Sequence, residues 1–399
     1  MKNTAAQRAG LPGWTYLDPD MFSLERECIF RRHWHIACHI SHVAEAGDFI
    51  TLDIAGERAL VIRGKDGVLR GFHNLCRHRG SRVVAETSGN CPGPLVCPFH
   101  AWSFNHDGTL RTAARSNTLP PLDPQEWGLK PLSLDIWQGF VFIRFADSPV
   151  RRPSERFSRF DDEVAAYDLA GLVAAAPISV TTPVAVNWKS VRDVDNEGYH
   201  VAKAHPGLHA LYGGDYRDEP CEDGISRSIG RFNDPAGNIW SVRHYLGLMD
   251  QLDPPCNTLP RQWVYLGMFP NTVIGLYPDS VIFYQDIPID HDHTAVRYAV
   301  LRRPREGRAQ RLARYLSMRI DAITGIEDEQ LTIWSYEAMK SSAFDGLMLS
   351  DLESGVMQYH AALRQEMPVM EQATKPEGGT LAALNAALLD AADRQDASC

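Results

Sequence analysis

Residues 76–100 read CRHRGSRVVAETSGNCPGPLVCPFH, and they carry two short pairs of metal-binding side chains. One residue separates Cys76 from His78, two residues separate Cys97 from His100, and eighteen residues lie between the pairs. The runs GVLRGFHNL and LV, which precede the two pairs, are typical of β-strands, so we expect both pairs on loops at strand ends. Thiolates and imidazoles on two such loops can close over one metal centre.

Two kinds of metal centre fit two cysteines and two histidines. Four such ligands make a tetrahedral zinc site. They also make a [2Fe–2S] cluster in which two thiolates bind one iron and two imidazoles bind the other, which raises its reduction potential. Zinc fingers usually pair cysteine with cysteine and histidine with histidine, whereas each pair here is mixed. The spacing therefore favours the iron–sulfur cluster over zinc.

The composition limits the class of protein. The chain has 399 residues, of which 44% are hydrophobic and 23% charged, which is enough for a large core in two domains. A net charge of −10 argues against binding to nucleic acid or to an anionic membrane surface. The N-terminal residues contain no apolar signal segment, and the eight scattered cysteines do not form a disulfide framework.

A second cluster of polar side chains, EGYHVAKAHP, begins at Glu197 and ends at Pro206. His200 and His205 would point about 140° apart on an ideal helix and would not converge. However, the proline disfavours helical geometry at His205, and a distorted last turn can swing both imidazoles toward one ion. Glu197 lies three residues before His200, so it can accept a hydrogen bond from the outer nitrogen of a ligating histidine.

Two histidines need a further ligand, and one carboxylate would complete the 2-His-1-carboxylate triad of non-haem Fe(II) oxygenases. Such a triad occupies one face of an octahedron and leaves positions open for O2 and water. Spacing alone does not select the acid, because those of GIEDEQL, residues 325–331, would equally complement the positive end of a helix that starts after Gly325. His209, four residues after His205, is a rival ligand.

These motifs together resemble the α (catalytic) subunits of Rieske non-haem iron oxygenases, and the resemblance covers nearly the whole chain. The matching stretches are NLCRHRG, CPFHAW, the H-x4-H pair and the late helix GIEDEQLTIWSYEAM. The resemblance implies a Rieske [2Fe–2S] cluster and a mononuclear Fe(II). The cluster would be bound by Cys76, His78, Cys97 and His100, and the mononuclear iron would be bound by His200, His205 and Asp328.

The resemblance also implies how the two centres work together. A Rieske cluster passes single electrons, and the iron uses two of them with O2 to hydroxylate a small organic substrate. In the family the cluster serves the iron of the next subunit in a head-to-tail ring, usually a homotrimer, so Glu197 would link His200 to His100 of that neighbour. A dinucleotide-binding fingerprint is missing from the sequence, so we expect a separate NAD(P)H-dependent reductase, with or without a ferredoxin. Because no apolar signal segment was found, we also expect a cytoplasmic location.

The residue at position 197 bears on the class of substrate. Family members often carry aspartate at the position of Glu197, and glutamate resembles the branch that acts on quaternary amines such as carnitine. Hydroxylation of a betaine-like compound is thus favoured over hydroxylation of an aromatic ring or acid. Some strand aromatics of the second domain would line the pocket, although most aromatics in strands belong to the core. The candidates are Trp263, Tyr265, Phe269, Tyr277, Phe283 and Tyr284. A zinc hydrolase and a simple electron carrier are the rival classes.

We predict an α+β fold with a small antiparallel β domain and a larger domain in which helices flank an antiparallel sheet. Residues 191–208 look helical, residues 240–301 mostly form strands, and residues 308–340 are helical with an interruption near Gly325. The proline-rich segment DSPVRRPSE predicts a linker. The expected divisions are an N-terminal segment packed on the catalytic domain at 1–44, the Rieske domain at 45–146, the linker at 147–155 and the catalytic domain at 156–399.

Other polar clusters have simpler interpretations. HWHIACH, residues 33–39, alternates with apolar residues and predicts an early strand. DHDH, residues 290–293, predicts a polar turn between strands. Asp193 and Asp195 are expected on a helix surface or as supporting acids, and Cys91 as a loop thiol.

Overall fold

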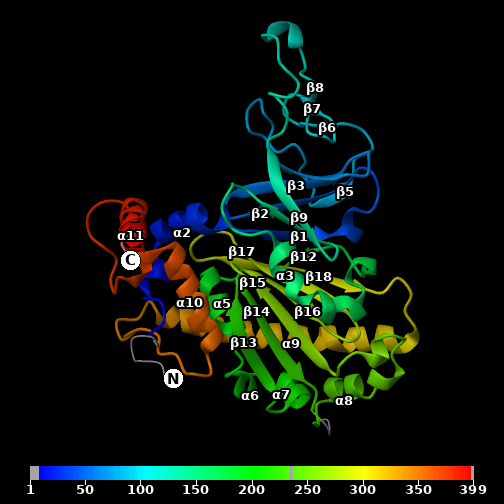
Figure 1. The fold of residues 1–399 in the computed structure, drawn as a ribbon, viewed down its shortest axis with the longest axis vertical. Helices are drawn as coiled ribbons and strands as arrows, with labels where there is room; N and C mark the ends of the chain where they lie inside the picture. Colours follow the sequence, from blue (N-terminus) through cyan, green and yellow to red (C-terminus); the bar gives the residue numbers. More distant parts are fainter. Residues whose placement is uncertain (1–8, 234–236, 397–399) are drawn as a thin grey trace.

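The computed structural model describes residues 9–233 and 237–396, and these residues form two β-sheet assemblies stacked along the long axis of the molecule (Figure 1). The upper assembly is a seven-stranded antiparallel sheet. Its strands in spatial order are β1 (His35–His39), β10 (Phe140–Arg144), β9 (Pro131–Trp137), β4 (Leu69–His73), β3 (Glu57–Arg63), β2 (Asp48–Ile54) and β5 (Ser88–Asn90).

The β2–β3 hairpin illustrates why this part of the chain forms strands. From Ile50 to Ile54, β2 alternates between buried and more exposed side chains. By contrast, β3 buries residues 59–62 without a break, because its two faces pack in two different hydrophobic clusters. Ala55 and Gly56 form a two-residue loop with φ values of 47° and 82°. Positive φ at both positions gives the hairpin turn whose twist matches that of the strands it joins.

A small three-stranded sheet lies at the upper end, or tip, of the molecule, below the loop with the short helical turn Ser116–Thr118 (Figure 1). Its strands are β6 (Leu95–Val96), β7 (Ser103–Phe104) and β8 (Leu110–Thr112). A separate hydrophobic cluster holds this sheet on β3 and β4, and it includes Leu60, Phe72, Trp102 and Phe104 together with Cys76 and Cys97.

The lower assembly is an eight-stranded antiparallel sheet. Seven strands follow one another in space and β12 (Ser179–Val180) also pairs with β18. The seven are β11 (Val173–Ala174), β18 (Thr294–Arg302), β17 (Val281–Pro288), β16 (Thr272–Leu276), β15 (Gln262–Met268), β14 (Ile225–Arg231) and β13 (Tyr216–Glu222).

Helices flank the lower sheet (Figure 1). Those that shape the site are α5 (Trp188–Asp195), α6 (Val201–Ala204), α7 (Pro206–Tyr212) and α9 (Arg308–Ala338). The remaining helices are the short α1 (Trp14–Leu17), α2 (Pro19–Glu25), α3 (Pro153–Phe157) and α4 (Asp161–Val164), then α8 (Trp240–Leu246), α10 (Ser354–Glu366) and α11 (Leu381–Asp396).

The predicted α+β fold, with a small β domain and a larger sheet flanked by helices, is confirmed. The strand expected within residues 33–39 is β1, which joins the upper sheet. Three local expectations are wrong. The helix over 191–208 divides into three short helices, residues 240–246 are helical, and α9 continues through Gly325. One glycine costs a helix about 1 kcal/mol, which the packing of so long a helix offsets.

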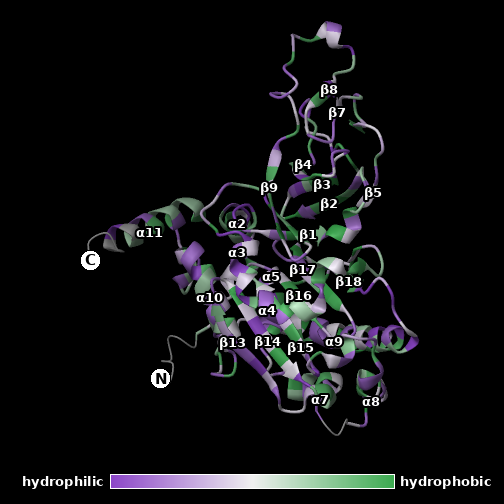
Figure 2. Cartoon of the chain, turned by 45° about the vertical axis from the view of Figure 1, so that its right-hand side comes forward, coloured by the Kyte–Doolittle hydropathy of each residue, from purple (hydrophilic) through white to green (hydrophobic). Residues whose placement is uncertain are grey.

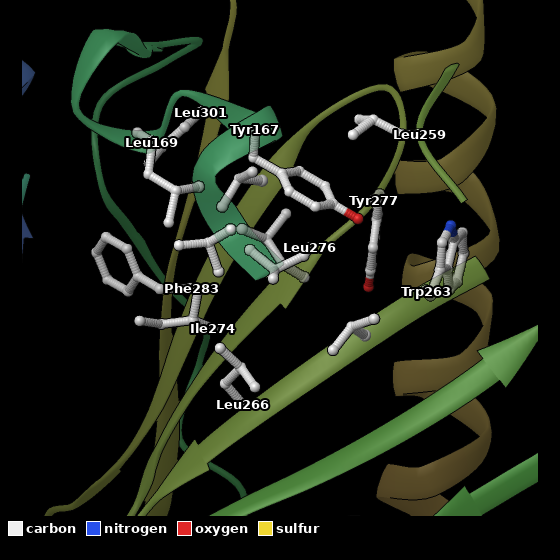
Figure 3. Close-up of a cluster of buried hydrophobic side chains, with 14 of the residues drawn as sticks. Tyr167, Leu169, Leu259, Trp263, Leu266, Ile274, Leu276, Tyr277, Phe283 and Leu301 are labelled. Carbon is white, nitrogen blue, oxygen red and sulfur yellow. The ribbon is translucent and has the colours of Figure 1, made fainter. Parts of the chain in front are cut away.

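The largest core cluster fills the space between the lower sheet and its helices. Hydrophobic residues gather at β15, β16 and β18 (Figure 2). Figure 3 shows its centre, where Tyr277 lies between Tyr167 and Trp263 above a layer of aliphatic side chains. The rings of Trp263 and Tyr277 stack with centroids 4.0 Å apart and planes 13° apart. Among the described residues, no helix is both long and apolar enough to cross a membrane.

A buried ion pair joins the N-terminal helix α2 to helix α5, which flanks the lower sheet. Lys189 at the start of α5 pairs with Glu25 at the end of α2, and both side chains are fully buried. Trp188 Nε1 also donates a hydrogen bond to Glu25 Oε2 at 2.7 Å. Burial raises the pKa of Glu25 although Lys189 opposes the shift, so the carboxylate depends on its partner to stay charged.

Replacement of Lys189 by methionine is expected to lower the free energy of unfolding by about 3–5 kcal/mol, because Glu25 would remain buried without a counter-charge. Urea unfolding followed by circular dichroism measures this change. The Glu25→Gln/Lys189→Met double variant serves as the control and should regain much of the loss. A single variant as stable as the wild type would show that the pair does not anchor α2.

Candidate metal centres and substrate site

The first candidate metal centre lies on two loops at the tip of the molecule. Cys76 follows β4, and Cys97 follows β6 directly. Each loop is closed by its own backbone, since Cys76 N donates to Ser81 O at 2.7 Å and Cys97 N donates to Trp102 O at 2.8 Å. Both cysteines are buried, at 2% exposure each, whereas His78 is exposed.

The donor atoms form a thiol pair and an imidazole pair. Burial raises the pKa of the Cys76 thiol to about 11, and the adjacent Cys97 thiol contributes to the rise, which places the two sulfurs side by side. The rings of His78 and His100 have centroids 4.7 Å apart, and His78 stacks on Trp102 at 5.0 Å. The thiol pair is thus buried and the imidazole pair faces solvent.

This division fits a two-iron cluster better than a single ion. A tetrahedral zinc site would hold all four donor atoms within about 4 Å of one another, given zinc–ligand bonds of about 2.0–2.3 Å. Among the described residues, two groups bring at least three ligand atoms within 4.8 Å of one another, and Cys76, His78, Cys97 and His100 are not one of them. A [2Fe–2S] cluster separates thiolates from imidazoles by its two irons.

The second candidate metal centre lies at the lower end of the molecule, where α6, α7 and α9 meet (Figure 1). A break in the chain between α6 and α7 builds it. Pro206 opens α7, and His205 before it has φ −116° and ψ 83°, which is not helical. Because of this break, the Nε2 atoms of His200 and His205 approach to 2.9 Å, although the residues are five apart in sequence.

Asp328, on α9, is the third member of this group. Its Oδ1 lies 2.8 Å from His205 Nε2 and 3.4 Å from His200 Nε2. An ion with bonds of about 2.1 Å at right angles would place ligand atoms about 3.0 Å apart, so the three separations match one face of an octahedron. Asp328 Oδ1 is buried, and the two imidazole nitrogens are its polar neighbours in this group.

Two glutamates hold the outer nitrogens of the histidines. Glu197 contacts His200 Nδ1, and Glu327 Oε2 lies 2.8 Å from His205 Nδ1. Burial lowers the pKa of His200, but hydrogen bonds with Asp328 and Glu197 outweigh it and raise the pKa to about 10. Such carboxylate–histidine pairs fix the ring orientation and make the inner nitrogen a better ligand.

The contact of Glu327 with His205 is not predicted by the sequence analysis, in which the acids of residues 325–331 are candidates for the third ligand or charges at a helix start. The signal was available: an acid directly before the aspartate lies 100° away on the helix and can reach a different face of the site. Glu197 was expected to support His200, and its other oxygen, Oε2, accepts from the backbone N–H of His200 at 3.2 Å. Gly198 beside it allows the Tyr216 ring to pack against the backbone, where a Cβ atom would collide with it.

The other polar residues singled out from the sequence lie elsewhere. His209 lies exposed on α7, outside the three-ligand group. Asp193 accepts a hydrogen bond from Tyr16 at 2.6 Å and pairs with His360 Nε2 at 2.8 Å. Asp195 accepts from Tyr284 at 2.7 Å. Residues 290–293 form the turn between β17 and β18, where Asp290, His291 and Asp292 make a second, solvent-accessible group of possible ligands.

The strand aromatics divide into two sets. Phe283 is part of the core against Phe140, and Phe269 packs against His33 and Tyr359. By contrast, the Tyr265 and Tyr277 hydroxyls lie 3.4 Å apart, and Tyr277 reaches Asp321 on α9, the helix that carries Asp328.

Two family descriptions match the chain over the two assemblies. The Rieske [2Fe–2S] domain matches residues 33–123, and the ring hydroxylating alpha subunit (catalytic domain) matches residues 165–368. The chain belongs to the family of ring-hydroxylating oxygenase alpha subunits. This is a family of oxidoreductases that carry a Rieske [2Fe–2S] cluster and a mononuclear iron, and the two donor sets described above fit these cofactors.

Among curated relatives, the carnitine monooxygenase oxygenase subunit of Acinetobacter pittii is 35% identical over 195 residues, which are 48% of this chain and 52% of the relative. The glycine betaine monooxygenase oxygenase subunit of Pseudomonas aeruginosa is 34% identical over 198 residues, 50% of this chain and 45% of the relative. The chain spans about half the length of the curated relatives it matches.

A solved structure of the quaternary ammonium Rieske monooxygenase CntA has the same fold. The TM-score is 0.75 at 24% identity, over 90% of this chain and 96% of CntA. At this identity the likeness concerns the fold, and it extends over both sheet assemblies.

Replacement of Glu327 by glutamine is expected to weaken binding of Fe(II) at the mononuclear site about 10–100-fold, because His205 would lose its charged partner. Titration of the metal-depleted site with Fe(II) measures the affinity, while the visible spectrum reports on the cluster. Glu329→Gln, an exposed acid one residue beyond Asp328, is the matched control and should bind normally. His200→Ala should abolish the site altogether, and unchanged affinity in Glu327→Gln would exclude a supporting role.

Proposed function

We propose that this chain is the oxygenase component of a Rieske system that oxidises a quaternary ammonium compound, with O2 and with electrons from a separate NAD(P)H-dependent reductase. The observation that supports the chemistry is one chain with both donor sets: Cys76, His78, Cys97 and His100 on the tip loops and His200, His205 and Asp328 below. The relatives act, by their names, on carnitine and glycine betaine, and this supports the substrate class.

The proposed reaction balances as follows. A substrate methyl group, O2, two electrons and two protons give a hydroxymethyl group and water. The residues of the tip loops would hold a cluster that supplies the electrons singly, and His200, His205 and Asp328 would hold an iron that supplies the activation of O2. If the methyl group is on a quaternary nitrogen, the carbon then leaves as formaldehyde, the hydroxyl proton is released, and the C–N electron pair stays on the demethylated amine.

The arrangement of the chain supports electron transfer between subunits. The cluster loops near β6 and the helices α6 and α7 lie at opposite ends of the long axis (Figure 1). Each end also exposes large apolar side chains beside its metal-binding residues: Phe99 at 53% exposure at the tip, and Tyr199 at 58% and Ile326 at 71% near the iron site. Such patches mark association surfaces. A closed ring of copies, such as a homotrimer, would bring a tip against a neighbour's lower end.

Glu197 occupies the position from which it would link the two centres. Within one chain its carboxylate already contacts His200 Nδ1 and the backbone N–H groups of Tyr199 and His200. A carboxylate has about four acceptor positions, so it can accept a further hydrogen bond from His100 of a neighbouring copy. We infer that Glu197 is the bridge between subunits.

The reductase, or a ferredoxin that carries electrons from the reductase to this chain, would dock near the cluster. Arg79 lies over Phe99 at 5.1 Å, and Arg77 lies on the same loop. These cations suit an acidic electron donor, although the chain as a whole is negative. A cytoplasmic location, where NAD(P)H is made available to reductases, belongs to the same proposal.

The substrate class is tested by O2 uptake of the protein with both iron centres loaded and a surrogate reductase present. Glycine betaine, carnitine and choline should stimulate uptake, and a demethylated product should appear with one formaldehyde per O2. Benzoate and naphthalene are the comparison for the rival aromatic class. Uptake and hydroxylated product with the aromatic compounds alone would overturn the proposed substrate class but leave the oxygenase chemistry standing.

Glu197→Ala is expected to retain the cluster and the iron at saturating Fe(II) and to lose more than 99% of turnover, because the link between His200 and the neighbouring His100 would be missing. Single-turnover reduction of the cluster should remain normal, while its re-oxidation by the substrate-bound iron site should slow in the same proportion. Exposed Glu329→Ala is the control. Normal re-oxidation in Glu197→Ala would contradict the bridge.

A further inference from the structure

The space between the lower sheet and helices α5, α7 and α9 contains a concentration of tyrosine hydroxyls and carboxyl groups. Tyr212 and Tyr265 bring their hydroxyl oxygens to 3.0 Å, and the hydroxyl oxygens of Tyr265 and Tyr277 lie 3.4 Å apart. The groups considered are Tyr212, Tyr216, Tyr265, Tyr277 and Tyr284 with Asp195, Asp218 and Asp321.

Two acids in this set, Asp218 and Asp321, have no basic partner among the described residues, and Asp218 accepts a hydrogen bond from Ser228 Oγ at 2.6 Å. Tyr277 donates a hydrogen bond to Asp321 Oδ1 at 3.2 Å. Its Oδ2 is buried and has no hydrogen-bond partner among the described residues. The charge that acts on it is the like charge of Asp279, and burial, the larger cause, raises the pKa of Asp321 to about 8. By contrast, Asp195 is paired with Arg192.

Asp321 stands at a fixed place relative to the mononuclear site. It lies seven residues before Asp328 on α9, and Tyr212 lies seven residues after His205 at the end of α7. Seven residues make two helical turns, or about 10 Å. Gly207 of α7 lies close against Ile320 of α9, so the two helices are in contact beside Asp321.

The tyrosine rings give this place the character of a cation site. Trp263 stacks on one face of Tyr277, and the Tyr265 ring stands edge-on to Tyr277 with centroids 6.0 Å apart. Tyr265, Tyr216 and Tyr284 are only partly buried, whereas Tyr212 and Tyr277 are buried. Aromatic faces attract cations, and a quaternary ammonium group, which has no N–H to donate, binds through such faces and through charge.

We propose that Asp321 is the counter-charge for the cationic head of the substrate, which the ring of Tyr265 contacts about two helical turns from the mononuclear iron. This inference rests on the proposed function and names a specificity-determining residue for it. A buried carboxylate is costly without a cation, and a bound quaternary ammonium would supply the missing charge. A reactive methyl group on that nitrogen would then point along α7 and α9 toward the ligands.

The test compares two ligands of the same shape that differ in charge. Choline and its neutral isostere 3,3-dimethylbutan-1-ol are titrated calorimetrically into the protein with both iron centres loaded, under nitrogen. The wild type should bind choline at least tenfold more tightly than the isostere. Asp321→Asn should lose at least tenfold in choline affinity and leave the isostere unchanged. Glu337→Gln, the same charge change at an exposed position of α9, is the control and should behave as wild type.

A second pair of variants keeps the test decisive if Asp321→Asn folds poorly. Tyr265→Leu removes the ring face and should reduce the preference for choline over the isostere, whereas Tyr265→Phe retains the ring and should retain the preference. Choline binding by folded Asp321→Asn that equals that of the wild type would overturn the inference, even if the wild type oxidises betaines. A wild type that oxidises only aromatic compounds and binds both ligands equally would overturn the inference and the proposed substrate class together.

Discussion

The break in the backbone at His205 is the constraint on which the catalytic end of this molecule depends. A continuous helix would direct His200 and His205 away from each other, and the chain would then hold no pair of imidazoles there. Pro206 prevents the helix from continuing, and the non-helical geometry of His205 brings the two Nε2 atoms to 2.9 Å. The same proline opens α7, so one residue both turns the ligand and starts the helix that carries Tyr212 toward the interior.

Helix α9 provides the other half of the site. Its 31 residues place Asp328 against the two histidines, Glu327 against the outer nitrogen of His205, and Asp321 two turns away among the tyrosines. A rigid helix keeps these three acids at constant spacing, because the rise per residue is the same along it. The distance between a cationic group held at Asp321 and the oxygen-binding position is thereby set by the helix and not by a mobile loop.

The two donor sets follow opposite designs. At the tip, the thiols are buried and the imidazoles face solvent, which suits a centre that accepts and passes electrons at a surface. At the lower end, His205 is 1% exposed and carboxylates surround the ligands, which suits a centre that binds small molecules in a restricted space. Since these ends lie far apart in one chain (Figure 1), the arrangement is most useful in a ring where unlike ends meet.

Much of this arrangement can be read from local sequence, because the decisive signals are short. The spacing of Cys76, His78, Cys97 and His100 indicated the class of metal centre, and Pro206 indicated the break at His205. Strands and glycine turns indicated the α+β fold. Sequence alone could not choose among Glu327, Asp328 and Glu329, or show that α9 runs unbroken through Gly325, because both depend on which face of α9 packs on the sheet. Nor could it show that Asp321, Tyr212 and Tyr277 meet, since contacts between residues far apart in the chain exist only once the helices and the sheet have packed.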